Sequence, residues 1–555
     1  MAEQLYFSRD SKMFVGFDNK LWEVPVLDGF SFSQSTNQSE ISLSEMQGAD
    51  GLSRRGNRVF TDSLAPAEFS FSTYARPYQN TEHGGVEEVL WAVMAGADKY
   101  QDQTTGGSAT AATAAVSSLA GAETGTYTIN ANTTGVTYGG NGTNDADGTE
   151  EGWQFDVVIT AADAVNSTVT VTAGGYGWAQ NNTLTVPAAV FGGSGGSVVI
   201  TITTVDTTGA SFYRLSQPDP NSEFGPTVIE PAGDKSVINF GQSNRSTLGE
   251  CDIYFIMETS STIPMIYKLE NAAINEASID FEVDGIATIN WSGFAKNVVD
   301  MTSSLNTAAA NRKAYVINAS SPANIAARIT AAKALTNEFG ATGNRVADPG
   351  AGSIIFNRGN NNEVLLVTGT GSTDAVLAIT TGVASTTTFI RNRLTQLLVS
   401  TTDTTNFPSG NNGAFSLTLT GGNITISNNI SYLVPEELGA VNVPIEHVTG
   451  GRTVTGNFTC YLTFDDTNAG SSVDLFNDMV GTGLNQVVNN FNVTFQIGGS
   501  TGTPRINVIM PKVHINVPSH SIEDVISVET NFASYTDEFN VANEVQLEYI
   551  GPDIT

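Results

Sequence analysis

Residues 30–32 (Phe-Ser-Phe), 58–61 (Arg-Val-Phe-Thr) and 68–71 (Glu-Phe-Ser-Phe) precede an apolar segment at 86–96. About 390 positions later, the same succession returns as 424–426 (Ile-Thr-Ile), 452–455 (Arg-Thr-Val-Thr), 459–462 (Thr-Cys-Tyr-Leu) and a segment at 472–481. A repeat of this length indicates a duplicated domain and not a short solenoid repeat.

The two copies also end alike. Residues 251–258 precede 264–291 in the first copy, and 491–497 precede 504–532 in the second. The offset has fallen to about 240 here, so the first copy contains an insertion of roughly 150 residues. Twinned domains in one chain predict a subunit that builds a ring with half as many chains as domains.

The composition favours a β-rich protein with many turns. Hydrophobic residues make up 40% of the 555 residues, charged residues only 14%, and Gly, Thr, Ser and Asn are abundant. The net charge of −32 excludes a dominant positive surface for nucleic acid. Cys251 and Cys460 fit buried thiols in a reducing cytoplasm. We see no secretory signal and no run long enough to span a membrane.

Local patterns predict the elements. Residues 86–96 have helical spacing, and Asp28-Gly29 resembles the turn of a first hairpin. Residues 104–121 have a linker composition, and 415–426 suggest a hairpin. Further strands are expected at 153–160, 167–173, 182–186, 197–205, 353–356, 364–368 and 375–380. A helix near 323–339 would be capped by Ser321 before Pro322.

These patterns predict five segments. The first domain is split, 1–98 plus 240–305, and 105–210 is an inserted Gly/Thr-rich β module. Residues 211–239 form a return segment, 310–385 a second inserted α+β module, and 389–555 the second domain.

The sequence contains partial motifs of catalysis and metal binding, but the residues around them do not fit these functions. Two Gly-x-Ser-x-Gly matches, around Ser194 and Ser500, are followed by strand-like sequence and not by the helix of a nucleophile elbow. The four histidines have no metal-ligand spacing, and the calcium-like run 145–148 lacks its twelfth-position glutamate. We therefore expect no catalytic residue, no cofactor and no metal site.

One acidic hairpin is a candidate functional surface. Alternation over 280–289 places Phe281 and Val283 on one face of a strand and Asp280, Glu282 and Asp284 on the other, before Asp284-Gly285 turns the chain.

Residues 21–32 (Leu-Trp-Glu-Val-Pro-Val-Leu-Asp-Gly-Phe-Ser-Phe), 61–74, 268–272 and 278–293 resemble the tail tube (major tail) proteins of long-tailed bacteriophages. The resemblance covers 1–98 and 240–300 well and 389–555 more weakly. It implies a mainly β fold with two tandem tail-tube-like antiparallel β-sandwich or barrel domains. Each would have a flanking helix, and small β-rich modules would be inserted.

The same resemblance implies a function. Some noncontractile tails are built from chains with two fused tube domains, which form homotrimeric rings with pseudo-sixfold symmetry. Stacked rings would make a hollow conduit for ejection of genomic DNA, which would pass without specific binding. Asp280, Glu282 and Asp284 could line an acidic lumen. Implied partners are further copies of the chain and the tape measure, tail terminator and baseplate proteins, with no membrane. The location would be the virion tail, assembled in the host cytoplasm.

Three other functions stay open. A tail fibre or baseplate receptor-binding protein would suit the Gly/Thr-rich insert, although the duplicated core speaks against it. A carbohydrate-active β-protein would need a carboxylate pair at a cleft, and the sequence displays none. A secreted adhesin would need a signal segment.

Overall fold

The fold was derived from a computed structural model of the chain. It describes residues 6–7, 10–41, 58–77, 86–97, 99–103, 108–117, 119–130, 133–139, 151–160, 168–176, 178–206, 212–216, 227–232, 235–240, 248–257, 264–301, 313–318, 324–335, 348–360, 362–379, 389–435, 442–464, 470–481, 490–499, 503–521, 526–536 and 543–551. The mainly β fold is confirmed, because antiparallel ladders dominate the described residues. One compact unit comprises Met1–Tyr78, Gly85–Asp98 and Ile238–Thr555, and the other Gln79–Gly84 and Lys99–Val237.

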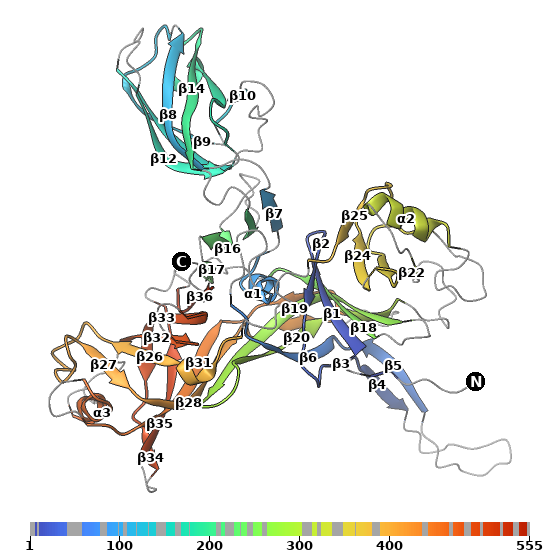
Figure 1. Cartoon of the computed structure of the whole chain (residues 1–555), viewed down its shortest axis with the longest axis vertical. Coiled ribbons are helices and arrows are strands. Elements are labelled where there is room, and N and C mark those ends of the chain that lie inside the picture. The colour runs from blue at the N-terminus through green and yellow to red at the C-terminus, as the bar shows by residue number, and fades with distance from the viewer. Residues whose placement is uncertain are drawn as a thin grey trace. The chain divides into compact units, whose positions relative to one another are not determined.

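A first strand set lies in the larger unit (Figure 1). It comprises β1 (Ser11–Phe17), β2 (Lys20–Val24), β3 (Ser31–Ser33), β6 (Ala67–Tyr74), β18 (Cys251–Met257), β19 (Met265–Glu282), β20 (Thr288–Ala295) and β21 (Asn297–Asp300). One ladder runs β2–β1–β18–β19–β21, and another runs β3–β6–β20–β19. The 18-residue strand β19 belongs to both ladders, so it carries the chain from one sheet into the other.

A second strand set has the same order. It comprises β26 (Gln396–Ser400), β27 (Ala414–Leu417), β28 (Leu419–Ser427), β31 (Thr453–Tyr461), β32 (Phe491–Ile497), β33 (Arg505–Ile515), β34 (Ser519–Ser521), β35 (Ser527–Ser534) and β36 (Gln546–Ile550). Its ladders run β27–β26–β32–β33–β36 and β28–β31–β35, and β35 pairs with both β33 and β34.

The two strand sets share an irregularity in strand register at matching positions. The pairing of β18 with β19 shifts between Cys251 and Ile253, and that of β32 with β33 shifts between Phe491 and Val493. These positions are 240 residues apart in both cases, so positions of the two sets can be matched through their registers. The registers match residues 68–71 with 455–458, and not with 459–462 as the sequence pattern indicated. Each set also has a hairpin between its matching strands: β4 (Thr36–Ile41) with β5 (Arg58–Leu64), and β29 (Ser431–Leu433) with β30 (Glu446–Val448).

Each set has one helix at the same place in its strand order. Helix α1 (Glu88–Met94) is buried along its whole length, and Gly96, with φ of 91°, follows its end. Its Trp91 packs against Trp291, with ring centroids 4.6 Å apart, and donates a 2.5 Å hydrogen bond to the Tyr549 hydroxyl. Helix α3 (Ser472–Val480) begins with a capping box formed by Ser471 and Asp474.

Residues 313–379 include a small sheet that forms the middle of three layers. These residues comprise β22 (Ala314–Ile317), α2 (Ile325–Lys333), β23 (Ile354–Asn357), β24 (Glu363–Val367) and β25 (Ala375–Leu377). One face of this sheet packs on Phe14, Tyr254 and Ile266 of the first strand set. Its other face packs on α2 through Ile329 and Ala332. The predicted cap was wrong: the Asn324 side chain accepts from the Ala327 N–H.

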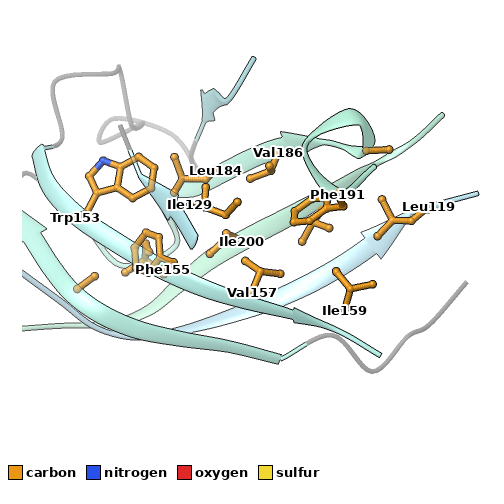
Figure 2. Close-up of a cluster of buried hydrophobic side chains, with 14 of the residues drawn as sticks. Leu119, Ile129, Trp153, Phe155, Val157, Ile159, Leu184, Val186, Phe191 and Ile200 are labelled. Carbon is orange, nitrogen blue, oxygen red and sulfur yellow. The ribbon is translucent and has the colours of Figure 1, made fainter. Parts of the chain in front are cut away.

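The smaller unit has its own core. It contains β7 (Lys99–Gln103), β8 (Ser108–Ser117), β9 (Gly125–Asn130), β10 (Thr137–Gly139), β11 (Glu151–Ile159), β12 (Thr168–Tyr176), β13 (Thr183–Pro187), the 3-10 helix η2 (Ala188–Phe191), β14 (Ser197–Asp206), β15 (Phe212–Ser216) and β16 (Thr227–Ala232), and is followed by β17 (Lys235–Asn239). The sheets β10–β13–β14–β8 and β12–β11–β9 bury aromatic and branched side chains between them (Figure 2).

Three local expectations were wrong. The first hairpin turns at Asp18-Asn19, whose positive φ angles of 40° and 60° suit a two-residue turn, and not at Asp28-Gly29. The supposed linker at 104–121 contributes β8. Residues 415–426 form no hairpin, because β27 pairs with β26 while β28 pairs with β31.

Candidate assembly and lumen surfaces

A continuous polar face crosses both strand sets. Strands β3, β6, β20, β19, β28, β31 and β35 are paired in this order and alternate buried with more exposed residues. The buried side includes Phe71, Ile279, Trp291, Ile424 and Phe458. The opposite side, which we name the polar face, carries Ser31, Ser33, Glu68, Ser70, Ser72, Glu276, Ser278, Asp280, Glu282, Thr288, Asn290, Ser292, Asn423, Thr425, Thr453, Thr455, Asn457, Thr459, Ser527, Glu529 and Asn531.

The middle of the polar face is a hydrogen-bonded network. Asp280 accepts from the amide group of Asn290 at 2.5 Å and from that of Asn423 at 2.9 Å. Asn423 also donates to the Ser278 hydroxyl at 2.7 Å, and the Ser72 hydroxyl donates to Asn290 at 2.6 Å. Four strands are thereby tied together through their polar side chains.

The three predicted acidic residues are in different environments. Asp280 is half-buried in this network, and Glu282 is exposed at the end of β19. Asp284 is not on the strand: it lies in the exposed turn, with its carboxylate 3.5 Å from the Arg393 guanidinium. Val283 was expected beside Phe281 but is 46% exposed, because β19 ends one residue earlier.

The polar face has a negative charge. Its acidic residues are Glu68, Glu276, Asp280, Glu282 and Glu529, and the described positions that define it include no Lys or Arg. Sequence reasoning found two of these five. Glu68, Glu276 and Glu529 were missed, although each lies beside buried residues in its own strand.

The seam between the strand sets is made by backbone pairing. Residues Glu276 to Glu282 of β19 pair antiparallel with Ser427 to Gly421 of β28. A hydrogen bond near this seam also links the two sets, because the Ala287 N–H donates to the Ile390 carbonyl at 3.0 Å. The first set thus joins the second edge to edge, with its β19 facing the strand that corresponds to β3.

A buried histidine also connects the two sets. His447 of β30 accepts from the Leu248 N–H through Nε2 at 2.9 Å, and its Nδ1 lies 3.0 Å from a Glu250 carboxylate oxygen. Burial would raise the pKa of Glu250, but hydrogen bonds from His447 and Asn271 outweigh it and hold that pKa below its ordinary value. These two contacts hold the His447 imidazole in place between the strand sets.

Of the remaining candidate motifs, only the one around Ser194 lies within the described residues. Ser194 lies in a turn before β14, and its N–H donates to the Ala120 carbonyl at 2.8 Å. Ser500, His83 and residues 145–148 lie outside the described residues. Within the described ranges, no three His, Cys, Asp or Glu side chains are grouped so that they could hold a metal ion. No described helix is long and apolar enough to cross a membrane.

Comparison with known proteins bears on the sequence resemblance. No protein-family model matches the chain. The tail tube protein pb6 of Escherichia phage T5 is 31% identical over 163 residues, which are 29% of this chain and 32% of pb6. The chain thus matches about a third of the length of that curated relative. The chain is similar to a phage tail tube protein, and the resemblance read from its own sequence is confirmed.

Proposed function

We propose that this chain is a structural, non-enzymatic protein of a phage tail. Three copies form a ring with pseudo-sixfold symmetry, and stacked rings form the hollow tube through which genomic DNA is ejected. The matching strand orders support an internal duplication, in which each strand set is one tube domain. The similarity to pb6 supports the tail tube role.

The observation that carries this proposal is the seam between β19 and β28. It joins the first set to the second through 276–282 and 421–427. By register, the positions that match Ser278–Asp280 and Asn423–Thr425 are β34 (Ser519–Ser521) and β3 (Ser31–Ser33). In the described pairings, β34 pairs only with β35 and β3 only with β6. A ring closes if β34 of each chain pairs with β3 of the next, because the sheet that carries the polar face then has no free edge.

The polar face would line the tube. Its five carboxylates and the net charge of −32 oppose the phosphate backbone of DNA. In its middle, Ser72, Asn290 and Asn423 donate to one another or to Asp280 across strands, so these donors are already engaged when a duplex passes. DNA would therefore move through without specific binding.

The inserted β module at 105–210 would decorate the outside of the tube. It has its own core, which includes Trp153, Phe155 and Phe191 (Figure 2). The chain would belong to the virion tail and be assembled in the host cytoplasm. It would contact tape measure, tail terminator and baseplate proteins.

Image averages of assembled tubes test the ring. Three chains per ring should give threefold symmetry at the outer surface and near-sixfold symmetry at the inner wall. Rings of six chains would contradict the proposal. In tubes of a variant that has residues 104–208 replaced by a short Gly/Ser linker, the bore should be normal and the outer diameter smaller. If that variant folds and never forms tubes, the module is part of an assembly contact.

Charge reversal tests the lumen. In assembled tubes, Glu282→Lys with Glu529→Lys should create duplex DNA binding that weakens steeply with salt. The matched control is Glu123→Lys, an exposed residue of the smaller unit, with Asp156→Lys on its β11. If the control tubes bind DNA as tightly as the lumen variant, the polar face does not line the bore.

A further inference from the structure

The segments that precede the two strand sets have the same local structure. The Asp10 N–H donates to the Phe7 carbonyl at 3.1 Å, and the Leu394 N–H donates to the Arg391 carbonyl at 3.3 Å within η4 (Asn392–Leu394). The strand registers give the same offset. Lys12 of β1 pairs with Ile256 of β18, and Gln396 of β26 pairs with Gln496, the residue of β32 that matches Ile256. By this offset Tyr6 matches Ile390, and Phe7 matches Arg391.

In the second set this segment is docked on the first set. The Ala287 N–H donates to the Ile390 carbonyl at 3.0 Å, and the Asn392 N–H donates to the Gly285 carbonyl at 3.2 Å. Ile390 is fully buried. Beside it, the Phe389 ring meets the edge of Tyr74, with centroids 5.6 Å apart. Residues 389–392 therefore cover the end of strands β6 and β20.

The matching end of the second set is open. By register, Tyr461 matches Tyr74 and Ile526 matches Ala287. Both sets have the same hydrogen bond at this end. The Ala75 N–H donates to the Ala287 carbonyl at 2.8 Å in the first set, and the Leu462 N–H donates to the Ile526 carbonyl at 3.0 Å in the second. Yet Ala287 is fully buried, whereas Tyr461, Phe464 and Ile526 are 41%, 70% and 40% exposed.

The segment that would match the cover is exposed as well. Tyr6 and Phe7 are 38% and 51% exposed, at the start of the first strand set. One apolar surface and one apolar segment are thus partly exposed in the chain, and their counterparts cover each other at the seam. A second copy of the chain is the occupant that repeats this geometry.

We propose that Tyr6 and Phe7 of one chain dock on Tyr461 and Ile526 of a second copy. The Ile526 N–H donates to the Tyr6 carbonyl of that copy, as Ala287 donates to Ile390, and the rings of Tyr6 and Phe7 cover the exposed end of β31 and β35. This interface rests on the proposed ring. It adds a contact that is separate from the edge pairing of β34 with β3.

Cysteine cross-linking of assembled tubes tests the contact. The variant Phe7→Cys with Ile526→Cys, treated with a short bis-maleimide, should give two-chain and three-chain species on denaturing gels. The control variant Arg391→Cys with Ile286→Cys lies at the seam, where these two residues form a β-bridge and neither is buried, so it should cross-link within one chain only. Cys251 and Cys460 are buried, and burial raises the pKa of Cys460 to about 12, so the native thiols should react slowly.

The outcomes separate the contact from the ring. Tubes with three chains per ring and no cross-link between Phe7→Cys and Ile526→Cys overturn the contact and leave the ring standing. A cross-link confined to one chain also overturns it. Tubes with six chains per ring overturn both proposals.

A second variant measures what the contact contributes. Phe7→Ser should change the unfolding of the single chain only slightly, because half of the side chain is exposed there, and should raise the concentration needed for assembly by at least about tenfold. Val59→Ser on β5 is the control, since Val59 is 60% exposed and outside the proposed contact. Unchanged assembly of Phe7→Ser, with a normal ring, would contradict the contact.

Discussion

Helices α1 and α3 hold matching places in the two strand sets, but they are stabilised in different ways. Helix α3 has a capping box at Ser471 and Asp474 and leaves Val480 half exposed. Helix α1 has no side-chain cap and no exposed residue, and it buries Glu87 and Glu88. The difference teaches that a helix enclosed on all sides relies on tertiary packing, whereas a partly exposed helix uses local signals.

The largest effect should come from emptying the enclosed site. Trp91→Ala removes a fully buried indole that contacts Trp291 and Phe240, and it leaves the Tyr549 hydroxyl without its donor. We expect a loss of about 3–5 kcal/mol in the free energy of unfolding, measured by urea denaturation of the unassembled chain. Phe464→Ala, at an exposed site, is the control. A loss below about 1 kcal/mol for Trp91→Ala would show that α1 is not held by its packing.

The buried carboxyl beside α1 should make stability depend on pH. Burial raises the pKa of Glu87 to about 8, against a smaller lowering by Arg76, while Glu88 adds to the rise. A raised acid pKa means that the folded chain keeps a proton that the unfolded chain loses. The stabilisation is therefore full below pH 4.5 and is lost as pH rises towards 8.

We expect the free energy of unfolding to fall by about 3 kcal/mol between pH 5 and pH 8. Glu87→Gln should remove most of this dependence, and Glu123→Gln, at an exposed position, should retain it. Urea titrations at several pH values provide the measurement. Equal pH dependence in wild type and Glu87→Gln would assign the titration to another group.

The smallest effect concerns the local signal of α3. Ser471→Ala removes the hydroxyl that caps the Asp474 N–H, so we expect a loss of about 1 kcal/mol. Ser33→Ala, an exposed strand position, serves as the comparison. Urea midpoints with unchanged slopes would measure the difference. If both variants unfold at the wild-type midpoint, the capping box contributes nothing to stability.

The sequence was informative where a local period is strong. Strands β11, β13 and β14 fall close to their predicted ranges because apolar residues alternate along them, as Trp153, Phe155 and Val157 do. Strand β8 was missed because Ser108–Ser117 consists mostly of Ala, Ser and Thr, which carry little alternation in hydrophobicity. Small residues there acquire a face only through pairing with β14.

The candidate surface was predictable only in part. Alternation identified Asp280 and Glu282, but the partners of Asp280 include Asn423, which lies 143 residues away in the chain. No local pattern links such positions. The helix cap failed for a similar reason: Ser321 before Pro322 and Asn324 are both good capping residues, and the side-chain bond to Ala327 selects Asn324.

The seam at residues 389–392 lies within one chain, so it should be insensitive to dilution. The chain between β21 and β26 joins the two strand sets covalently, and residues 389–392 of this connection add hydrogen bonds to the first set. A joint within one chain forms at an effective concentration in the millimolar range, whatever the amount of protein present. A joint between chains follows the bulk concentration. In a ring of three chains, dilution would thus separate only the three contacts between chains. Each chain released would keep its two strand sets paired and could assemble again.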